Sequence, residues 1–63
     1  MSAIFNNLTR SERYVFAFPS VQFPPVVGTF HEYMPDGTLR VVEASDGREY
    51  FLNPAFLAWV RRA

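Results

Sequence analysis

The chain has 63 residues, with six arginines, no lysine, six carboxylates, one histidine and no cysteine. A chain of this length forms one domain, which buries only about 60% of the surface that it exposes when unfolded. The lack of cysteine excludes disulfides and thiolate metal sites, and one histidine is too few for an ordinary zinc site. We expect a single domain over residues 1–63 with no metal and no cofactor. The balanced charge provides no general attraction to nucleic acid or to membranes.

Residues 1–12 form the expected N-terminal segment. Its first residues lack the charged start and the apolar stretch of a secretory signal, and no run in the chain approaches the roughly 20 apolar residues of a membrane span. We therefore expect a soluble, cytoplasmic protein. Near the end of this segment, Thr9-Arg10-Ser11-Glu12 has the form of a capping box, which predicts a short helical turn.

Residues 13–18, Arg-Tyr-Val-Phe-Ala-Phe, predict the first strand. A continuous run of β-favouring residues is typical of a strand that is buried on both faces, and a short helix is the alternative. The loop that follows, residues 19–25, contains three prolines, which exclude a central strand and favour an extended surface connection. We expect Val21 and Phe23 of this loop to pack against the sheet while Gln22 faces solvent.

Two Asp-Gly pairs, Asp36-Gly37 and Asp46-Gly47, separate three segments rich in β-branched and aromatic residues. Asp-Gly is a strong turn signal between strands, so the spacing predicts an antiparallel meander. The predicted strands cover residues 26–34, 38–44 and 48–52. Together with the first strand they form a four-stranded β core over residues 13–52.

The two turns also predict which residues lie opposite one another. A three-residue loop at the first turn places Glu32 opposite Arg40 and Phe30 opposite Val42. A two-residue type I′ turn at the second places Val42 opposite Phe51. These registers predict a core row of Phe30, Val42 and Phe51, and they make Glu32 and Arg40 a cross-strand pair that supports the register.

The opposite face of the meander is also apolar. It is predicted to carry His31, Tyr33, Leu39, Val41 and Leu52. Because both faces need cover, we expect the sheet to curl around the first face, while the N-terminal segment, a C-terminal helix or another subunit covers the second.

The last residues, 53–62, predict a short helix. Asn53 is suited to cap it and Pro54 to begin it, because proline lacks an amide hydrogen that would be unpaired there. An apolar stripe at helical spacing is formed by Phe56, Trp59 and Val60.

The order of these elements resembles the SH3-like barrel class. The resemblance covers roughly residues 13–62 and depends on the run Tyr50-Phe51-Leu52-Asn53-Pro54 before the terminal helix. The class includes plasmid-encoded dihydrofolate reductases, to which residues 16–20 are similar, but residues 50–52 lack the glutamine of that family, so no activity or residue role is transferred. The expected fold is all-β: a small SH3-like antiparallel barrel, or a strongly curled sheet, with a short C-terminal helix.

Eleven aromatic residues are many for so small a core. We expect some of them to contact a partner, since aromatic residues are enriched at interfaces. The predicted function is a non-catalytic interaction module, either a protein-binding adaptor or a homo-oligomeric accessory protein of a bacterial or phage kind. The predicted protein-binding residues are Tyr33, Tyr50, Phe56 and Trp59.

The alternative is a small nucleic-acid-binding regulator. Arginines near both termini would form one basic patch if the two ends converge, and aromatic side chains beside such a patch suit stacking on unpaired bases. The predicted residues are Arg10, Arg13, Arg61 and Arg62.

No catalytic residue is predicted. Histidine is a common general base, but a lone histidine in a strand, such as His31, more often fills a half-buried surface. The chain has no glycine-rich phosphate loop and no nucleophile elbow. An enzymatic role would require a symmetric pocket around His31 that forms only on assembly.

Overall fold

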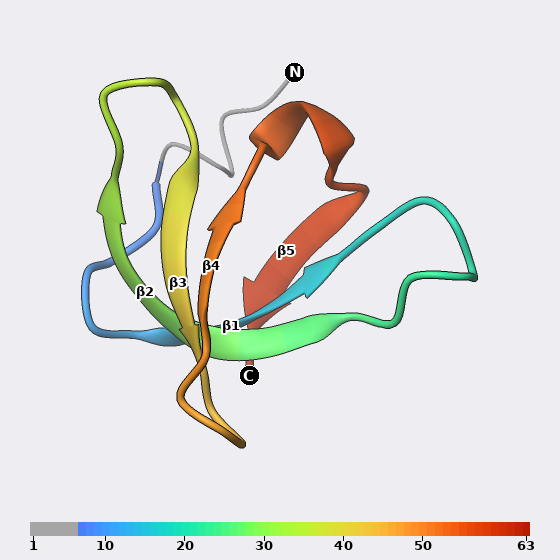
Figure 1. Ribbon diagram of the computed structural model, residues 1–63, viewed down its shortest axis with the longest axis horizontal. Helices are drawn as coiled ribbons and strands as arrows, with labels where there is room; N and C mark the ends of the chain where they lie inside the picture. Colours follow the sequence, from blue (N-terminus) through green and yellow to red (C-terminus); the bar gives the residue numbers. More distant parts are fainter. Residues whose placement is uncertain (1–6) are drawn as a thin grey trace.

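The computed structural model describes residues 7–63, which form one antiparallel sheet of five strands (Figure 1). The strands are β1 (Arg13–Ala17), β2 (Val26–Tyr33), β3 (Leu39–Glu43), β4 (Glu49–Leu52) and β5 (Trp59–Arg62). A single 3₁₀ turn, η2 (Pro54–Phe56), separates β4 from β5. Residues 1–6 of the predicted N-terminal segment, with the prediction that they carry no secretory signal, lie outside the described residues.

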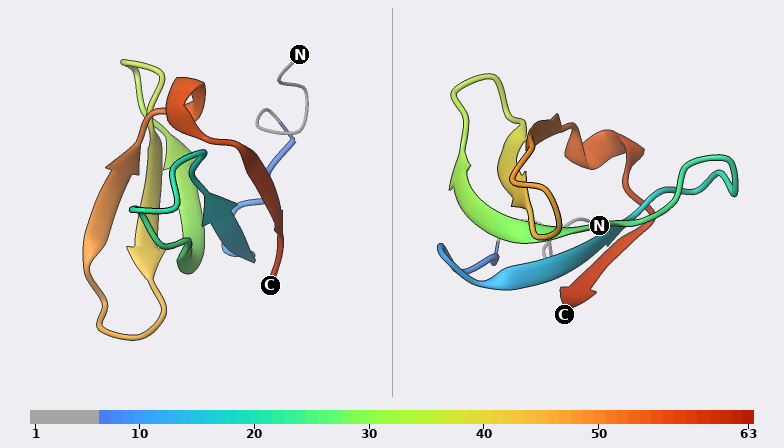
Figure 2. Two further views of the ribbon diagram at one scale, coloured as in Figure 1. Left: turned by 90° about the vertical axis from the view of Figure 1, so that its right-hand side faces the viewer. Right: turned by 60° about the horizontal axis from the view of Figure 1, so that its bottom comes forward.

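The predicted all-β fold is confirmed, and the four predicted strands agree with β1 to β4 to within one residue at each end. The strand order is β4-β3-β2-β1-β5, so β4 and β5 are the two edges. The sheet curls strongly (Figure 2). Within residues 7–63 no hydrogen-bonded ladder joins β4 to β5. The structure is therefore a curled sheet, and closure into a barrel stays a prediction.

The position of β1 explains the unbroken apolar run in this strand. It pairs with β2 on one edge and with β5 on the other. Tyr14 and Phe16 belong to the core, while the alternating residues Val15 and Ala17 are buried on the opposite face. The predicted strand, buried on both faces, is confirmed, and the alternative of a short helix is wrong.

The predicted C-terminal helix is wrong. Asn53 caps a turn as expected, since its side chain accepts a hydrogen bond from the Ala55 amide at 3.0 Å, but η2 ends at Phe56. Leu57 is already extended, with φ −95° and ψ 138°. A helix of about eight residues is marginal on its own hydrogen bonds. Residues 59–62 of the same stretch instead form β5, which pairs with β1 and so gives hydrogen-bond partners to the backbone groups on the free edge of β1.

The helical stripe predicted for Phe56, Trp59 and Val60 is consequently absent. In β5 the side chains alternate between faces, so Val60 enters the core while Trp59 faces outward and is 45% exposed. Phe56 lies outside the core on η2.

The first turn of the meander follows the prediction. The Met34 amide donates to the Thr38 carbonyl at 2.8 Å, and Gly37 adopts a left-handed φ of +91° within a three-residue loop. The second turn is longer than predicted, because the Glu43 amide donates to the Arg48 carbonyl at 2.7 Å and so encloses residues 44–47. The predicted two-residue type I′ turn is therefore wrong.

β2 and β3 contain the predicted Glu32–Arg40 pair, but an irregularity between Phe30 and Glu32 shifts the register beyond it. Phe30 lies opposite Val41 instead of Val42. A β-bulge inserts one extra residue, which turns the side chains beyond it to the other face. Phe30 therefore joins Val41 in the core, and Val42 faces outward.

The longer second turn shifts the pairing of β3 with β4 by two residues. Val41 lies opposite Tyr50, not Leu52, and Phe51 lies opposite Arg40. A shift of two residues keeps each side chain on its face, so Phe51 points outward and is 53% exposed. The predicted core row of Phe30, Val42 and Phe51 is wrong.

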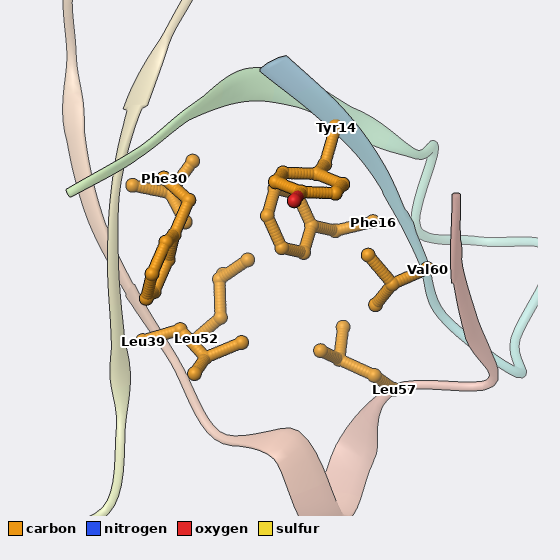
Figure 3. Packing of buried hydrophobic residues seen from close by; sticks show 8 residues of the cluster. Tyr14, Phe16, Phe30, Leu39, Leu52, Leu57 and Val60 are labelled. Carbon is orange, nitrogen blue, oxygen red and sulfur yellow. The ribbon is translucent and has the colours of Figure 1, made fainter. Parts of the chain in front are cut away.

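Eight buried side chains form one core inside the curl of the sheet (Figure 3). They are Tyr14, Phe16, Phe30, Leu39, Val41, Leu52, Leu57 and Val60. All five strands contribute, and burial of each large side chain contributes roughly 1.5–3 kcal/mol. The second apolar face of the prediction is thus the core face, and the curl of the sheet itself covers it.

The segment before β1 runs alongside β2 without forming a helix, since the Ser11 amide donates to the Phe30 carbonyl and the Phe30 amide to the Glu12 carbonyl. The Glu12 amide donates to the Thr9 carbonyl at 3.2 Å, which closes a single turn with Ser11 at a left-handed φ of +72°. The predicted helical turn is therefore an isolated turn. Among the described residues, no helix has the length and apolar character needed to cross a membrane.

Candidate functional site

An apolar pocket of about 420 Å³ lies between the loop that joins β1 to β2 and the turn η2. This loop projects from the body of the sheet in Figures 1 and 2. The pocket is lined by Phe18, Pro19, Ser20, Phe23, Ala55 and Phe56. Two segments far apart in the sequence therefore form its walls.

The loop wall is folded by Ser20. Its hydroxyl accepts a hydrogen bond from the Gln22 amide at 3.1 Å, and its carbonyl accepts one from the Phe23 amide at 3.2 Å. This turn brings the ring of Phe23 to 6.2 Å from that of Phe18, edge to face. The loop wall is thus held by local hydrogen bonds and one ring contact.

The expectation that the loop packs its apolar residues against the sheet is wrong. Val21 is fully exposed, and Phe23 remains 61% exposed despite its contact with Phe18. Phe18 is half-buried and packs against the core. The loop is therefore held to the core at Phe18, while Val21 and Phe23 expose apolar surface to solvent.

The opposite wall is η2, where consecutive residues point in different directions. Phe56 is 66% exposed, whereas Leu57 is 8% exposed and belongs to the core. The Phe56 amide donates to the Asn53 carbonyl at 2.9 Å and the Leu57 amide to the Pro54 carbonyl at 3.2 Å. Burial of Leu57 therefore fixes the position from which Phe56 projects.

The chemistry of the pocket favours apolar contact over reaction. Among the described residues, the only polar side chain that lines it is that of Ser20, whose hydroxyl already accepts a hydrogen bond from the Gln22 amide. Within residues 7–63, no group of three or more histidine, aspartate or glutamate side chains could hold a metal ion. The pocket can bury an apolar or aromatic side chain, but it has no acid and base pair for proton transfer.

Of the four predicted protein-binding residues, only Phe56 lines the pocket. Tyr50 packs against the core, and its hydroxyl donates to a Glu43 carboxylate oxygen at 3.0 Å, which raises the pKa of the tyrosine. Trp59 lies on the outer face of β5, the face opposite the core. The four residues therefore do not form one surface around the pocket.

Tyr33, the remaining predicted residue, lies at the end of β2. Its ring contacts that of Phe30 edge to face at 4.8 Å, and its hydroxyl accepts a hydrogen bond from the Leu8 amide at 3.1 Å. It therefore helps to hold the segment before β1 against the sheet.

The sequence reasoning missed Phe18, Pro19 and Phe23 as site residues. A signal was present, because the loop combines two phenylalanines with three prolines. Proline restricts the backbone and lowers the entropy that is lost when a loop holds exposed apolar side chains in place. What the sequence did not show is that η2 lies across from this loop.

The arginines predicted for nucleic-acid binding are partly brought together. Pairing of β1 with β5 places Arg61 opposite Val15 and Arg62 opposite Tyr14, and the Ala63 amide donates to the Arg13 carbonyl. Arg13 and Arg61 therefore share the outer face as diagonal neighbours. Arg62 lies on the same edge strand but on its other face, and Arg10 lies in the turn before β1.

The remaining charged groups lie mainly in paired positions. Arg40 contacts Glu49 at 2.6 Å and Glu32 at 3.2 Å, and these hydrogen bonds and charges raise the pKa of the guanidinium. Arg48 contacts Asp46 at 3.2 Å. His31 is half-buried beside the bulge in β2, away from the pocket lining.

Comparison with known proteins identifies no relative of this chain: no protein-family model, no curated protein and no solved structure matches it.

Proposed function

We propose that this chain is a non-catalytic protein-binding module whose pocket takes an apolar or aromatic side chain from a partner protein. The observation that carries the proposal is the pocket itself, which Phe23 lines from the loop and Phe56 from η2, both with large exposed surfaces. Aromatic residues that fill or line a well-formed pocket contribute most of the binding free energy at many protein interfaces.

The lining favours a protein partner over a small polar metabolite. Small-molecule sites combine an apolar lining with several placed polar groups that fix the orientation of the ligand. Here Ser20 is the one polar side chain, and it is engaged in its own turn. An exposed apolar patch without orienting polar groups is typical of a protein contact.

We also propose that the curled sheet belongs to the SH3-like barrel class. Five short antiparallel strands that curl around one core, with a 3₁₀ turn before the last strand, support a place in the SH3-like barrel class. Fold class alone does not imply function, so the pocket, not the fold, supports protein binding.

Selection from a random peptide library tests the proposal. We expect selected peptides to share apolar or aromatic residues and to bind the chain with affinities that fall about tenfold or more, or 1.4 kcal/mol, in Phe23→Ala and Phe56→Ala. Phe51→Ala is the matched control, because Phe51 is 53% exposed and does not line the pocket. Peptides that bind both pocket variants as tightly as the original chain would contradict the proposal.

Self-association is the second form that such binding can take. Sedimentation equilibrium over a range of concentrations distinguishes the two forms. A mass that rises with concentration, falls to one chain in Phe56→Ala and is unchanged in Phe51→Ala assigns the partner as a second copy. A mass of one chain throughout, together with peptide binding, assigns it as another protein.

A further inference from the structure

We infer that the outer face of β1 and β5 binds single-stranded nucleic acid, a function separate from that of the pocket. The site consists of Trp59, Arg61 and Arg13, which lie on the face of the sheet opposite the core. None of these residues lines the pocket. The inference depends on three features: the distribution of charge over the sheet, the exposed ring of Trp59, and the buried side chains of β1 beside it.

Charge is segregated in this fold although the net charge is zero. Residues 7–25 and 54–63, which include β1 and β5, carry four arginines against one glutamate, a surplus of three positive charges. Residues 26–53, which include β2, β3 and β4, carry two arginines against five carboxylates, a surplus of three negative charges. Since β1 and β5 are neighbours at one side of the sheet, the positive charges gather there.

The two arginines of the site differ from the two arginines among the acidic residues 26–53. Arg40 and Arg48 each contact a carboxylate, whereas no ion pair to Arg13 or Arg61 is present among residues 7–63. The Arg61 guanidinium donates only a long hydrogen bond, at 3.4 Å, to the Arg62 carbonyl. Guanidinium groups without a carboxylate partner are available to phosphate oxygens, which they bind with charge-assisted hydrogen bonds.

Trp59 supplies a stacking surface beside these charges. It is 45% exposed, and the guanidinium carbon of Arg61 lies 5.6 Å from the centre of its ring. Unpaired bases stack on aromatic rings and on arginine planes, and stacking on a ring is tolerant of sequence. On the neighbouring strand β1, Ala17 lies opposite Trp59 and Val15 opposite Arg61, and both are buried, so the pair is flanked by well-packed side chains.

The site favours a single strand over a duplex. Bases in a duplex are stacked on one another and present only their edges in the grooves, and the major groove is read by a helix or a two-stranded ribbon. The described residues contain no α-helix to enter it, and β1 and β5 belong to a five-stranded sheet instead of forming a separate two-stranded ribbon. A flat aromatic and guanidinium surface with phosphate-binding groups fits unpaired bases.

Fluorescence anisotropy with a labelled oligothymidylate of about 16 nucleotides tests the inference. We expect binding at low salt that weakens as salt rises, with a slope of log K against log salt of about −1.4 for two phosphate contacts. Arg13→Gln and Arg61→Gln should each reduce the magnitude of that slope by about 0.7. Arg48→Gln is the matched control and should leave affinity and slope unchanged, because Arg48 lies among the acidic residues 26–53 and pairs with Asp46.

The aromatic contribution has its own readout. Trp59 is the only tryptophan, so stacking should quench the tryptophan fluorescence as the strand binds. Trp59→Ala should weaken binding about tenfold, and Trp59→Phe much less. Phe51→Ala should have no effect, because Phe51 is an exposed aromatic residue among the acidic residues 26–53. A urea unfolding curve for each variant separates loss of binding from loss of folding.

Three outcomes would overturn the inference. The first is no binding of the single strand at low salt. The second is a loss of affinity in Arg48→Gln or Phe51→Ala equal to that in the site variants, which would show that binding depends on overall charge or on another face. The third is equally tight binding of a duplex of the same length, of polyglutamate or of anionic phospholipid vesicles, which would indicate attraction to any polyanion.

Discussion

The Ala58 amide donates a hydrogen bond to the Ala17 carbonyl at 2.7 Å, and this bond joins the two segments that lead into the walls of the pocket. Ala17 ends β1 just before Phe18, and Ala58 follows η2 just before β5. The bond lies at the end of the β1–β5 pairing, next to the Ala17–Trp59 pair, and the two chain segments that form the pocket separate beyond it. The spacing between the loop and η2 therefore depends on a contact made by the backbone alone.

Ala58→Pro should weaken the pocket without changing a residue that lines it. Proline removes the donor of this bond, and loss of one backbone hydrogen bond lowers the unfolding free energy by about 1 kcal/mol. Urea unfolding measures this loss, and peptide affinity should fall with it. Ala58→Gly keeps the amide and serves as the control, and equal peptide affinity in both variants would show that the bond does not set the spacing.

Leu57→Ala should destabilise the protein much more than Phe56→Ala, although the two residues are adjacent. Leu57 belongs to the core, so its truncation leaves a cavity and should lower the unfolding free energy by about 2–5 kcal/mol. Phe56 faces solvent, so its truncation should cost less than about 1 kcal/mol. Thermal unfolding of both variants checks the contrast. Similar losses would indicate that Phe56 is packed more tightly than its 66% exposure implies.

Gly28→Ala should destabilise the pairing of β2 with β3. A Cβ atom at this position would lie 2.6 Å from the Val42 carbonyl oxygen and 2.7 Å from Cγ1 of Val41. Because the first of these atoms belongs to the backbone, the strands would have to move apart, and overpacking of this kind costs about 1–3 kcal/mol. Val27→Ala, at the exposed neighbouring position, should change stability much less in the same urea titration.

Tyr14→Phe should loosen the segment before β1 while leaving the core intact. The Tyr14 hydroxyl accepts a hydrogen bond from the Thr9 amide at 2.7 Å, and its ring packs against Phe16. The substitution removes only the hydroxyl, so the expected loss is about 0.5–1.5 kcal/mol. Hydrogen exchange of the Thr9 amide should accelerate. An unchanged exchange rate at Thr9 would mean that another contact holds this segment.

Asp36 should make stability depend on pH in the acid range. The backbone amide and the hydroxyl of Thr38 both donate to its carboxylate, at 3.0 and 2.7 Å, and these bonds lower the pKa of Asp36 below its ordinary value of 3.8. The folded state thus favours the ionised form. The resulting stabilisation is complete above pH 3.8 and is lost as the pH falls through the lower pKa of the folded state.

Asp36→Asn tests this dependence. The variant should show a smaller decrease of unfolding free energy between neutral and acid pH than the original chain, measured by urea unfolding at a series of pH values. Glu12→Gln is a control, because no hydrogen bond to that carboxylate is present among the described residues. An identical pH profile for Asp36→Asn and the original chain would contradict the assignment.

Local patterns were sufficient for most of the sheet. The apolar run of β1 and the two Asp-Gly turns predicted four strands and an antiparallel meander, and the first turn also predicted the pairing of Glu32 with Arg40. These signals depend on residues a few positions apart, where backbone preferences and turn chemistry act directly. The loop of the first turn agrees for the same reason, since Gly37 supplies the left-handed conformation that it needs.

The candidate site could not be predicted in the same way. Its walls are residues 18–23 and 55–56, which no local pattern relates to each other. The predicted aromatic surface combined residues from both faces of the sheet, because the bulge in β2 and the true conformation of the C-terminal residues were not visible in their spacing. Phe56 was the one predicted binding residue that lines the pocket.

A small all-β domain is predictable from the sequence, because its strand and turn signals are strong and local. The strand at residues 59–62 is not, because it forms where the free edge of β1 offers hydrogen bonds that a short isolated helix cannot match. That pairing also sets Ala58 against Ala17, brings Phe56 and Phe23 into the lining of one pocket, and brings Arg61 beside Arg13. Contacts between distant segments therefore decided where both proposed binding surfaces lie.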